Sequence, residues 1–196
     1  MELHEAIYQR RSVRHYTDAL VPPALINDLL MAAVQAPSAM NQQPWTFAVI
    51  RGRSRLNGYS ERAKAHLLSV LPQDLSLHAR AGTLASFEYN IFHGATTLVI
   101  ICAKPLPHHP AEDCCFAAQN FMLAAHALGL GTCPIGFARR WLNLPEIKAE
   151  IGIPDDYTIV MPIVVGWPSG KTAAPGRLAP EITCWHRAPE EPPGSR

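Results

Sequence analysis

Proline sets the strongest limit on what this chain can fold into. The chain has 18 prolines among 196 residues, about 9% against a usual ~5%. Proline lacks a backbone N–H and disfavours a helical conformation in the residue before it, so it interrupts both helices and strands. We therefore expect short helices and strands joined by ordered loops.

Hydrophobic spacing between the prolines predicts a helix-rich mixture of helices and strands. The segment 22–36 begins with Pro22 and Pro23, which suit a first helical turn, carries one apolar stripe, and ends before Pro37. Strands separated by longer helices indicate an α+β or α/β layer fold. The other expected helices cover residues 3–10, 56–70, 111–130 and 145–151, and the expected strands cover residues 46–51, 97–103 and 157–165, with a buried strand at 181–185 as a further option.

The chain shows neither an internal repeat nor a domain linker. We expect residues 1–187 to form a single domain and the Pro-rich residues 188–196 to form a flexible tail. The predicted helix 111–130 is apolar nearly all round, which is typical of a helix buried on several sides. In a chain of this size, that pattern suggests burial by a partner subunit.

Charge and cysteine content exclude several classes of protein. Lys and Arg number 17 and Asp and Glu number 16, a net charge of +1, so no general basic field attracts nucleic acid or an anionic membrane. The longest apolar runs, 98–103 and 159–165, are shorter than the ~18 residues that span a bilayer. The N-terminus has no signal-peptide core. Five cysteines without paired spacing are typical of reduced thiols, so we expect a cytoplasmic protein.

Three suggestive motifs fail on their spacing. Gly129 and Gly131 resemble a dinucleotide fingerprint, but Pro134 stands where the third glycine belongs and the segment follows a helix. Residues 166–172 resemble a phosphate-binding loop that is one residue short and lacks a following helix. The His, Cys and acidic residues at 108–115 fit no zinc spacing, so no metal is expected. Motifs of metalloproteases and serine hydrolases are absent from the sequence.

Two stretches are better candidates for a binding site. Residues 10–14 hold three arginines and a serine within five positions, a set that suits bidentate contacts to an anion such as a phosphomonoester. A solvated basic turn is the competing interpretation. Residues 37–45 form a stiff loop of small and amide side chains, which suits a planar heterocycle with mixed hydrogen-bonding edges. Trp45, at its end, fits a core residue.

These stretches belong to a set of four pieces by which the chain resembles the FMN-dependent nitroreductase family. The pieces occur in the family's order and span residues 6–181. They are Ala-Ile-Tyr-Gln-Arg-Arg-Ser-Val-Arg-His-Tyr from Ala6, Ala-Pro-Ser-Ala-Met-Asn-Gln-Gln-Pro-Trp from Ala36, the helix from Ala118 to Gly131 with Pro-Ile-Gly from Pro134, and Val-Val-Gly at 164–166 with Arg-Leu-Ala-Pro-Glu from Arg177.

The resemblance implies a three-layer α+β homodimer with a central, mostly antiparallel sheet flanked by helices and FMN at the subunit interface. It assigns four residues to the phosphate and ribityl end of FMN: Arg10, Arg11, Ser12 and Arg177. Arg14 would reach the pyrimidine edge of the ring and tune its reactivity, since the chemistry takes place on the flavin and no side chain is expected to be catalytic. The residues implied to lie on the ring are Pro134, Ile135 and Gly136 and, from the other subunit, Pro37, Ser38, Ala39 and Asn41.

The implied activity is transfer of hydride from NAD(P)H to FMN and then of electrons to a nitroaromatic, quinone or related acceptor, in a ping-pong cycle. Reductive dehalogenation, oxygen-dependent flavin fragmentation, and flavin binding without turnover stay open as rival functions. The chain departs from the family at Pro175, where a second base is frequent, and at Gly136, where some members carry an acid. Residues 60–90 match no subfamily, so the acceptor and the choice between NADH and NADPH stay open.

Overall fold

The computed structural model describes residues 1–70, 81–174 and 176–186. Its centre is a four-stranded sheet in the order β1-β2-β4-β3, in which every neighbouring pair is antiparallel. The strands are β1 (Trp45–Arg51), β2 (Thr97–Ala103), β3 (Gly131–Pro134) and β4 (Thr158–Gly166). All seven residues of β2 are buried, because helices cover both faces of the sheet.

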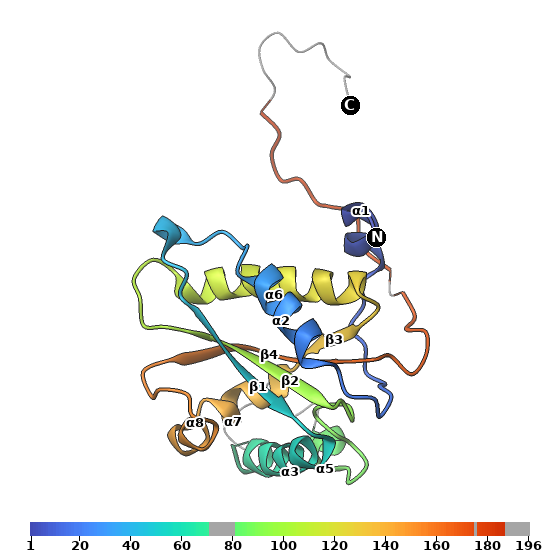
Figure 1. The fold of residues 1–196 in the computed structure, drawn as a ribbon, viewed down its shortest axis with the longest axis vertical. Helices are drawn as coiled ribbons and strands as arrows, with labels where there is room; N and C mark the ends of the chain where they lie inside the picture. The colour runs from blue at the N-terminus through green and yellow to red at the C-terminus, as the bar shows by residue number, and fades with distance from the viewer. Residues whose placement is uncertain (71–80, 175, 187–196) are drawn as a thin grey trace.

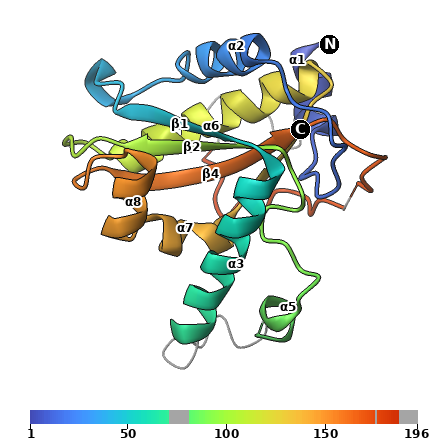
Figure 2. The same cartoon turned by 60° about the horizontal axis from the view of Figure 1, so that its bottom comes forward.

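Two layers of helices enclose the sheet (Figure 2). On one face lies the long helix α6 (Pro110–Ala127), with α2 (Pro23–Ala33) packed on its outer side (Figure 1). The other face is covered by α3 (Arg53–Val70), α7 (Gly136–Leu142) and α8 (Pro145–Ile151), with the short α5 (Ala81–Ala85) beside α3. The predicted three-layer α+β fold with an antiparallel sheet is confirmed.

Alternate residues of the strands divide the core between the two faces. In β2, Val99 and Ile101 pack in the cluster with α2 and α6, whereas Leu98 and Ile100 pack in the cluster with α3, α7 and α8. This division follows from the two-residue period of a strand. Trp45 is buried in the α2–α6 cluster, which confirms its predicted role in the core.

The predicted elements match most closely where apolar runs are bounded by proline. Strand β2 and helix α8 have the predicted bounds, and α6 ends at Ala127, three residues earlier than predicted. The chain leaves α6 through Gly129, whose φ of 76° is left-handed and suits glycine. Strand β3 and helix α7 were not predicted.

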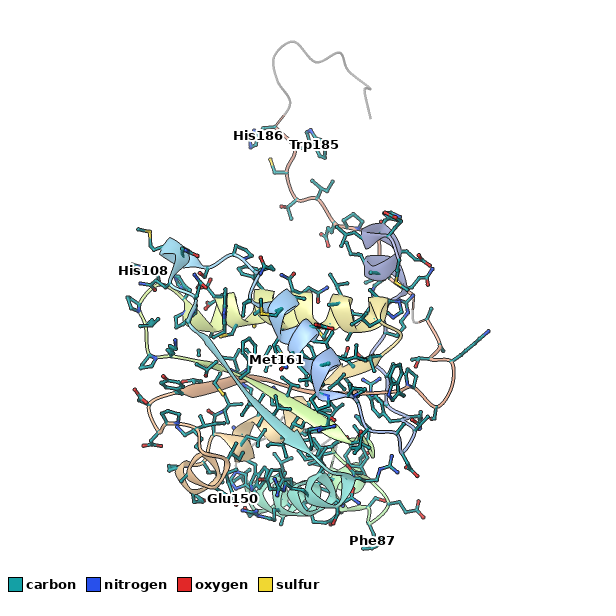
Figure 3. All side chains as sticks on the ribbon, in the orientation of Figure 1. Phe87, His108, Glu150, Met161, Trp185 and His186 are labelled. Atoms are coloured by element: carbon teal, nitrogen blue, oxygen red, sulfur yellow. The ribbon has the colours of Figure 1, made fainter. Side chains whose placement is uncertain are left out.

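The optional strand at 181–185 is not observed. Residues 181–186 run away from the body of the chain, with Trp185 and His186 far from the sheet (Figure 3). Trp185 is 70% exposed, and none of the described strands pairs with this segment. The predicted flexible tail at 188–196 lies outside the described residues.

Candidate functional site

The basic segment 10–14 is held along the edge of the sheet by backbone hydrogen bonds. It follows helix α1 (Leu3–Gln9), which ends at the arginine cluster as predicted. Val13 N–H donates to the Thr132 carbonyl of β3 at 2.9 Å, and Thr17 N–H donates to the Trp167 carbonyl after β4 at 2.9 Å. The segment therefore has a fixed position relative to the ends of β3 and β4.

Two glycines make this close approach possible. A Cβ on Gly131 would lie 2.7 Å from Cγ2 of Val13, and a Cβ on Gly166 would lie 2.9 Å from Cδ1 of Tyr16. Neither contact leaves room for a side chain, so glycine is required by packing at both positions. The sequence shows both glycines, but their role depends on a contact that is distant in sequence.

Four arginines of this region have no carboxylate partner within the described part of the chain. They are Arg10, Arg11, Arg14 and Arg177. Burial of the Arg10 guanidinium, with Arg177 and Arg11 nearby, lowers its pKa. Arg11 donates through Nη1 to the carbonyls of Tyr8 and Arg10 at 2.7 and 2.8 Å, while its buried Nε has no partner. An anion would relieve the repulsion and satisfy this N–H.

The arginines line a pocket of about 260 Å³. Its lining is Arg10, Arg11, Ser12, Arg14, Thr172, Ala173 and Arg177. All four residues assigned to the phosphate end of FMN are thus brought together. A phosphomonoester suits this set of donors.

A second cavity, of about 380 Å³, is more apolar in character and shares Arg14 with the first. Its lining is Arg14, Tyr89, Ile91, His93, Cys133, Pro134, Ile135, Gly136 and Phe137. Arg14 and the three consecutive residues predicted to lie on the ring, Pro134, Ile135 and Gly136, therefore line one cavity. Because Arg14 lines both cavities, one elongated ligand with an anionic end and a flat end suits the pair.

The loop residues Pro37, Ser38, Ala39 and Asn41 line neither cavity. The loop lies by the start of α6, where Ala39 N–H donates to the buried Asp113 carboxylate at 3.1 and 3.3 Å. The arginine segment lies near β3, which follows the other end of α6 (Figure 1). With 18 residues, α6 is about 27 Å long. One chain therefore does not bring the loop and the arginines into one site.

The loop itself has a constrained backbone. Met40, Asn41 and Gln43 have φ values of 52°, 53° and 47°, which are uncommon for residues with a side chain. Gln43 N–H donates to Ser38 Oγ at 3.0 Å, and the Gln43 side chain donates to Asn41 Oδ1 at 3.2 Å. Met40 at its tip is 83% exposed, so the loop presents a fixed outer surface.

Among the cavity-lining residues that sequence reasoning missed are Tyr89, His93, Phe137 and Thr172. The first three belong to no motif. Thr172 belongs to the segment 166–172, which was rejected as a phosphate-binding loop. The position of that segment directly after a buried strand was the sequence signal that could have identified Thr172. At 108–115, as elsewhere in the described residues, no three potential ligands gather around a metal position.

Comparison with known proteins identifies the pattern. The model described as "Nitroreductase family" matches residues 7–167. A protein of Archaeoglobus fulgidus, provisionally named NADH dehydrogenase/NAD(P)H nitroreductase, is 31% identical over 172 residues, covering 85% of this chain and 86% of its own. The chloronitrobenzene nitroreductase of Comamonas testosteroni is 26% identical over 206 residues, covering 87% of this chain and 88% of its own.

Solved structures show the same fold. A nitroreductase from Bacteroides fragilis, with FMN bound, superposes with a TM-score of 0.80 and 28% sequence identity, covering 95% of this chain and all of its own. No described helix has the length and apolar character that crossing a membrane requires.

Proposed function

Since the chain belongs to the nitroreductase family, we propose that it is an FMN-dependent oxidoreductase that takes hydride from NAD(P)H. Its acceptor would be a nitroaromatic, a quinone or a related compound. The observation that carries this proposal is a pocket of unpaired arginines joined, at Arg14, to a cavity lined by Pro134, Ile135 and Gly136. We place the enzyme in the cytoplasm, where its five free thiols would stay reduced.

The residues present fit FMN. Its phosphate would sit among Arg10, Arg11 and Arg177, where the orphaned Nε of Arg11 supplies a further donor. The ring would lie in the second cavity against Pro134 and Ile135. When bound, FMN supplies the hydride and electron transfer that no side chain performs.

The chain's own residues orient the flavin and set the field around it. A fixed positive charge at Arg14 stabilises negative charge on a bound ring and so favours its reduction. Neither cavity is lined by a carboxylate from the described residues. The proton that an acceptor needs in addition to the hydride equivalent would therefore come from solvent through the open side of the cavity.

A two-fold dimer would complete the site. The loop 37–41 and the arginine segment lie at opposite ends of α6, and dimers with a two-fold axis are the commonest oligomers. Such an axis would bring the loop of one subunit to the arginines of the other. The exposed apolar residues Phe116, on α6, and Met40 support this arrangement, at 51% and 83% exposure, since exposed apolar patches mark interfaces.

The test is anaerobic stopped-flow reduction of the purified holoprotein by NADH and by NADPH, followed by mixing with a panel of acceptors. We expect bleaching of the flavin absorbance near ~450 nm by at least one nucleotide and recovery with a quinone or nitroaromatic. A protein that binds FMN but is bleached by neither nucleotide would be a flavin-binding module. Recovery only with a halogenated aromatic would support reductive dehalogenation, and destruction of the flavin in oxygen would support flavin fragmentation.

A further inference from the structure

Three aromatic rings line the cavity of about 380 Å³, and none of them belongs to a motif in the sequence. The rings of Tyr89 and His93 contact each other edge-on, with centroids 6.2 Å apart, and those of Tyr89 and Phe137 do so at 6.5 Å. Two of the rings come from the segment before β2, and Phe137 comes from α7. The rest of the cavity includes Arg14 and the turn from Pro134 to Gly136.

His93 is held in an unusual backbone conformation at this cavity. Its N–H donates to the Asn90 carbonyl at 3.0 Å, and its φ of 55° is left-handed. Side-chain-bearing residues with this geometry gather at functional sites when the surrounding structure holds them there. Among residues 1–70, 81–174 and 176–186, the His93 imidazole has no hydrogen-bond partner. It is half-buried and lines the cavity, so a ligand in the cavity would meet it.

The imidazole is neutral at physiological pH. Burial, together with the positive charge of Arg14 and the nearby His15, lowers the pKa of His93 to about 4. A neutral imidazole has one N–H donor and one acceptor nitrogen. His93 can therefore donate a hydrogen bond without adding a second positive charge beside Arg14.

We propose that His93 donates a hydrogen bond to the oxygen of a planar aromatic acceptor, a quinone or a nitro compound, bound between the flavin and the rings of Tyr89 and Phe137. This inference rests on the proposed function. It assigns Arg14, Pro134 and Gly136 to the flavin and the aromatic side of the same cavity to the acceptor. Flat aromatic ligands suit such a wall, because rings gain from edge-on and offset contacts.

His93 selects the acceptor in this scheme and supplies no net proton. A quinone would gain a hydride equivalent, which is two electrons and one proton, from reduced FMN and one further proton from solvent, and would leave as the hydroquinone. The hydrogen bond orients the carbonyl and polarises it towards reduction. An acceptor without an oxygen in this position would lose that contact.

Two substitutions distinguish the effect of losing the imidazole from the effect of the left-handed backbone at position 93. His93→Leu removes the donor, whereas His93→Asn keeps an N–H donor in a residue type that tolerates a left-handed φ. His109→Leu is the matched control, since His109 has a φ of 61° and lies at the start of α6, outside both cavities.

The decisive measurement is binding to the oxidised holoenzyme, followed by flavin absorbance. The probes are acetophenone and its isostere α-methylstyrene, in which a CH2 group replaces the carbonyl oxygen. Wild type and His109→Leu should favour acetophenone, and His93→Leu should lose about two- to tenfold of that preference, the range for one neutral hydrogen bond. His93→Asn should recover part of it. FMN affinity should not change.

Kinetics add an independent readout. With benzoquinone, His93→Leu should raise KM by a similar factor, whereas His109→Leu should keep the wild-type KM. Two results would overturn the assignment of His93 to the acceptor. One is an unchanged preference for acetophenone in His93→Leu, and the other is weaker FMN binding without a change in that preference. Failure of wild type to be reduced by either nucleotide would refute the proposed function, yet the binding titration would still decide the role of His93.

Discussion

Arg10 illustrates how a single residue can oppose folding of the free protein and favour its complex. Its guanidinium is partly buried beside Arg11 and Arg177 without a carboxylate partner in the described chain, and these surroundings lower its pKa. Burial of an unpaired cation is unfavourable, whereas a charge-assisted contact to a phosphate is among the stronger hydrogen bonds. The residue is therefore placed for a ligand and not for stability.

Arg10→Ala should weaken FMN binding by about 1.5–3 kcal/mol, the range for a lost hydrogen bond to a charged group. Riboflavin, which lacks the phosphate, should bind wild type and the variant alike, as measured by fluorescence titration. Arg62→Ala is the control, because Arg62 pairs with Glu150 on the surface at 2.7 Å, and it should leave both affinities unchanged. An equal loss of riboflavin and FMN would remove Arg10 from the phosphate end.

Gly131 has a different role at the same site. Gly131→Ala should lower the free energy of unfolding by about 1–3 kcal/mol, the usual effect of overpacking, because the new Cβ would meet Val13 at 2.7 Å. It should also weaken FMN binding, since Val13 carries the arginine segment. Gly58→Ala, in the middle of α3 with open space around it, should raise stability by about 0.5–1 kcal/mol. Urea unfolding of both variants checks this contrast.

At the scale of elements, strong periodicity made the fold predictable. The apolar run of β2 and the Pro-to-Gly bounds of α8 fix those elements locally. Strand β3 has only four residues, with a glycine and a proline at its ends, and it forms because β4 and Val13 lie beside it. Helix α7 has seven residues with two arginines and depends on Trp141 packing in the core. Such short elements are determined by tertiary contacts.

The residues of the candidate site also differ in whether local sequence patterns or tertiary contacts reveal them. The arginine cluster and Pro134, Ile135 and Gly136, which line the two cavities, could be selected from the sequence because motifs mark them. His93 could not, since its importance arises from a cavity that joins residues from different parts of the chain.

The loop 37–41 depends on one carboxylate from another element. Asp113 accepts Ala39 N–H with both oxygens, and the loop holds left-handed residues at Met40 and Asn41. Asp113→Ala would leave the half-buried Ala39 N–H without its partner, so the free energy of unfolding should fall by about 1–3 kcal/mol. Proteolysis within the loop should become faster.

Two further variants test this explanation. Asp113→Asn keeps an oxygen acceptor and should lose less stability than Asp113→Ala. Glu112→Ala removes the neighbouring exposed acid of the same helical turn and should have little effect. If a protease cleaves the loop of Asp113→Ala no faster than that of wild type, then the loop is held by its internal hydrogen bonds alone.

At the scale of the whole molecule, α6 separates the two halves of the proposed site, the loop 37–41 and the arginine segment. Most of its apolar surface is covered within the chain by the sheet and α2, which reduces the area that the sequence assigned to a partner. What remains exposed on α6 includes Cys115 and Phe116. The distance between the loop 37–41 and the arginine segment therefore supports a dimer more strongly than the apolar face of α6 does.

A shared site predicts complementation between two inactive variants. Arg14→Ala impairs the arginine half-site and Asn41→Ala impairs the loop half-site, so each homodimer would have two damaged sites. After the two are unfolded and refolded together, half of the molecules should be mixed dimers if the chains associate at random. One site of each mixed dimer would take Arg14 from one chain and Asn41 from the other, and would be intact. The mixture should therefore recover about a quarter of the wild-type activity per chain on this two-fold arrangement, and sedimentation should show dimers that FMN stabilises by mass action. Refolding each variant alone is the control and should recover nothing. A monomer that binds FMN fully, or a refolded mixture no more active than its components, would show that one chain makes the whole site.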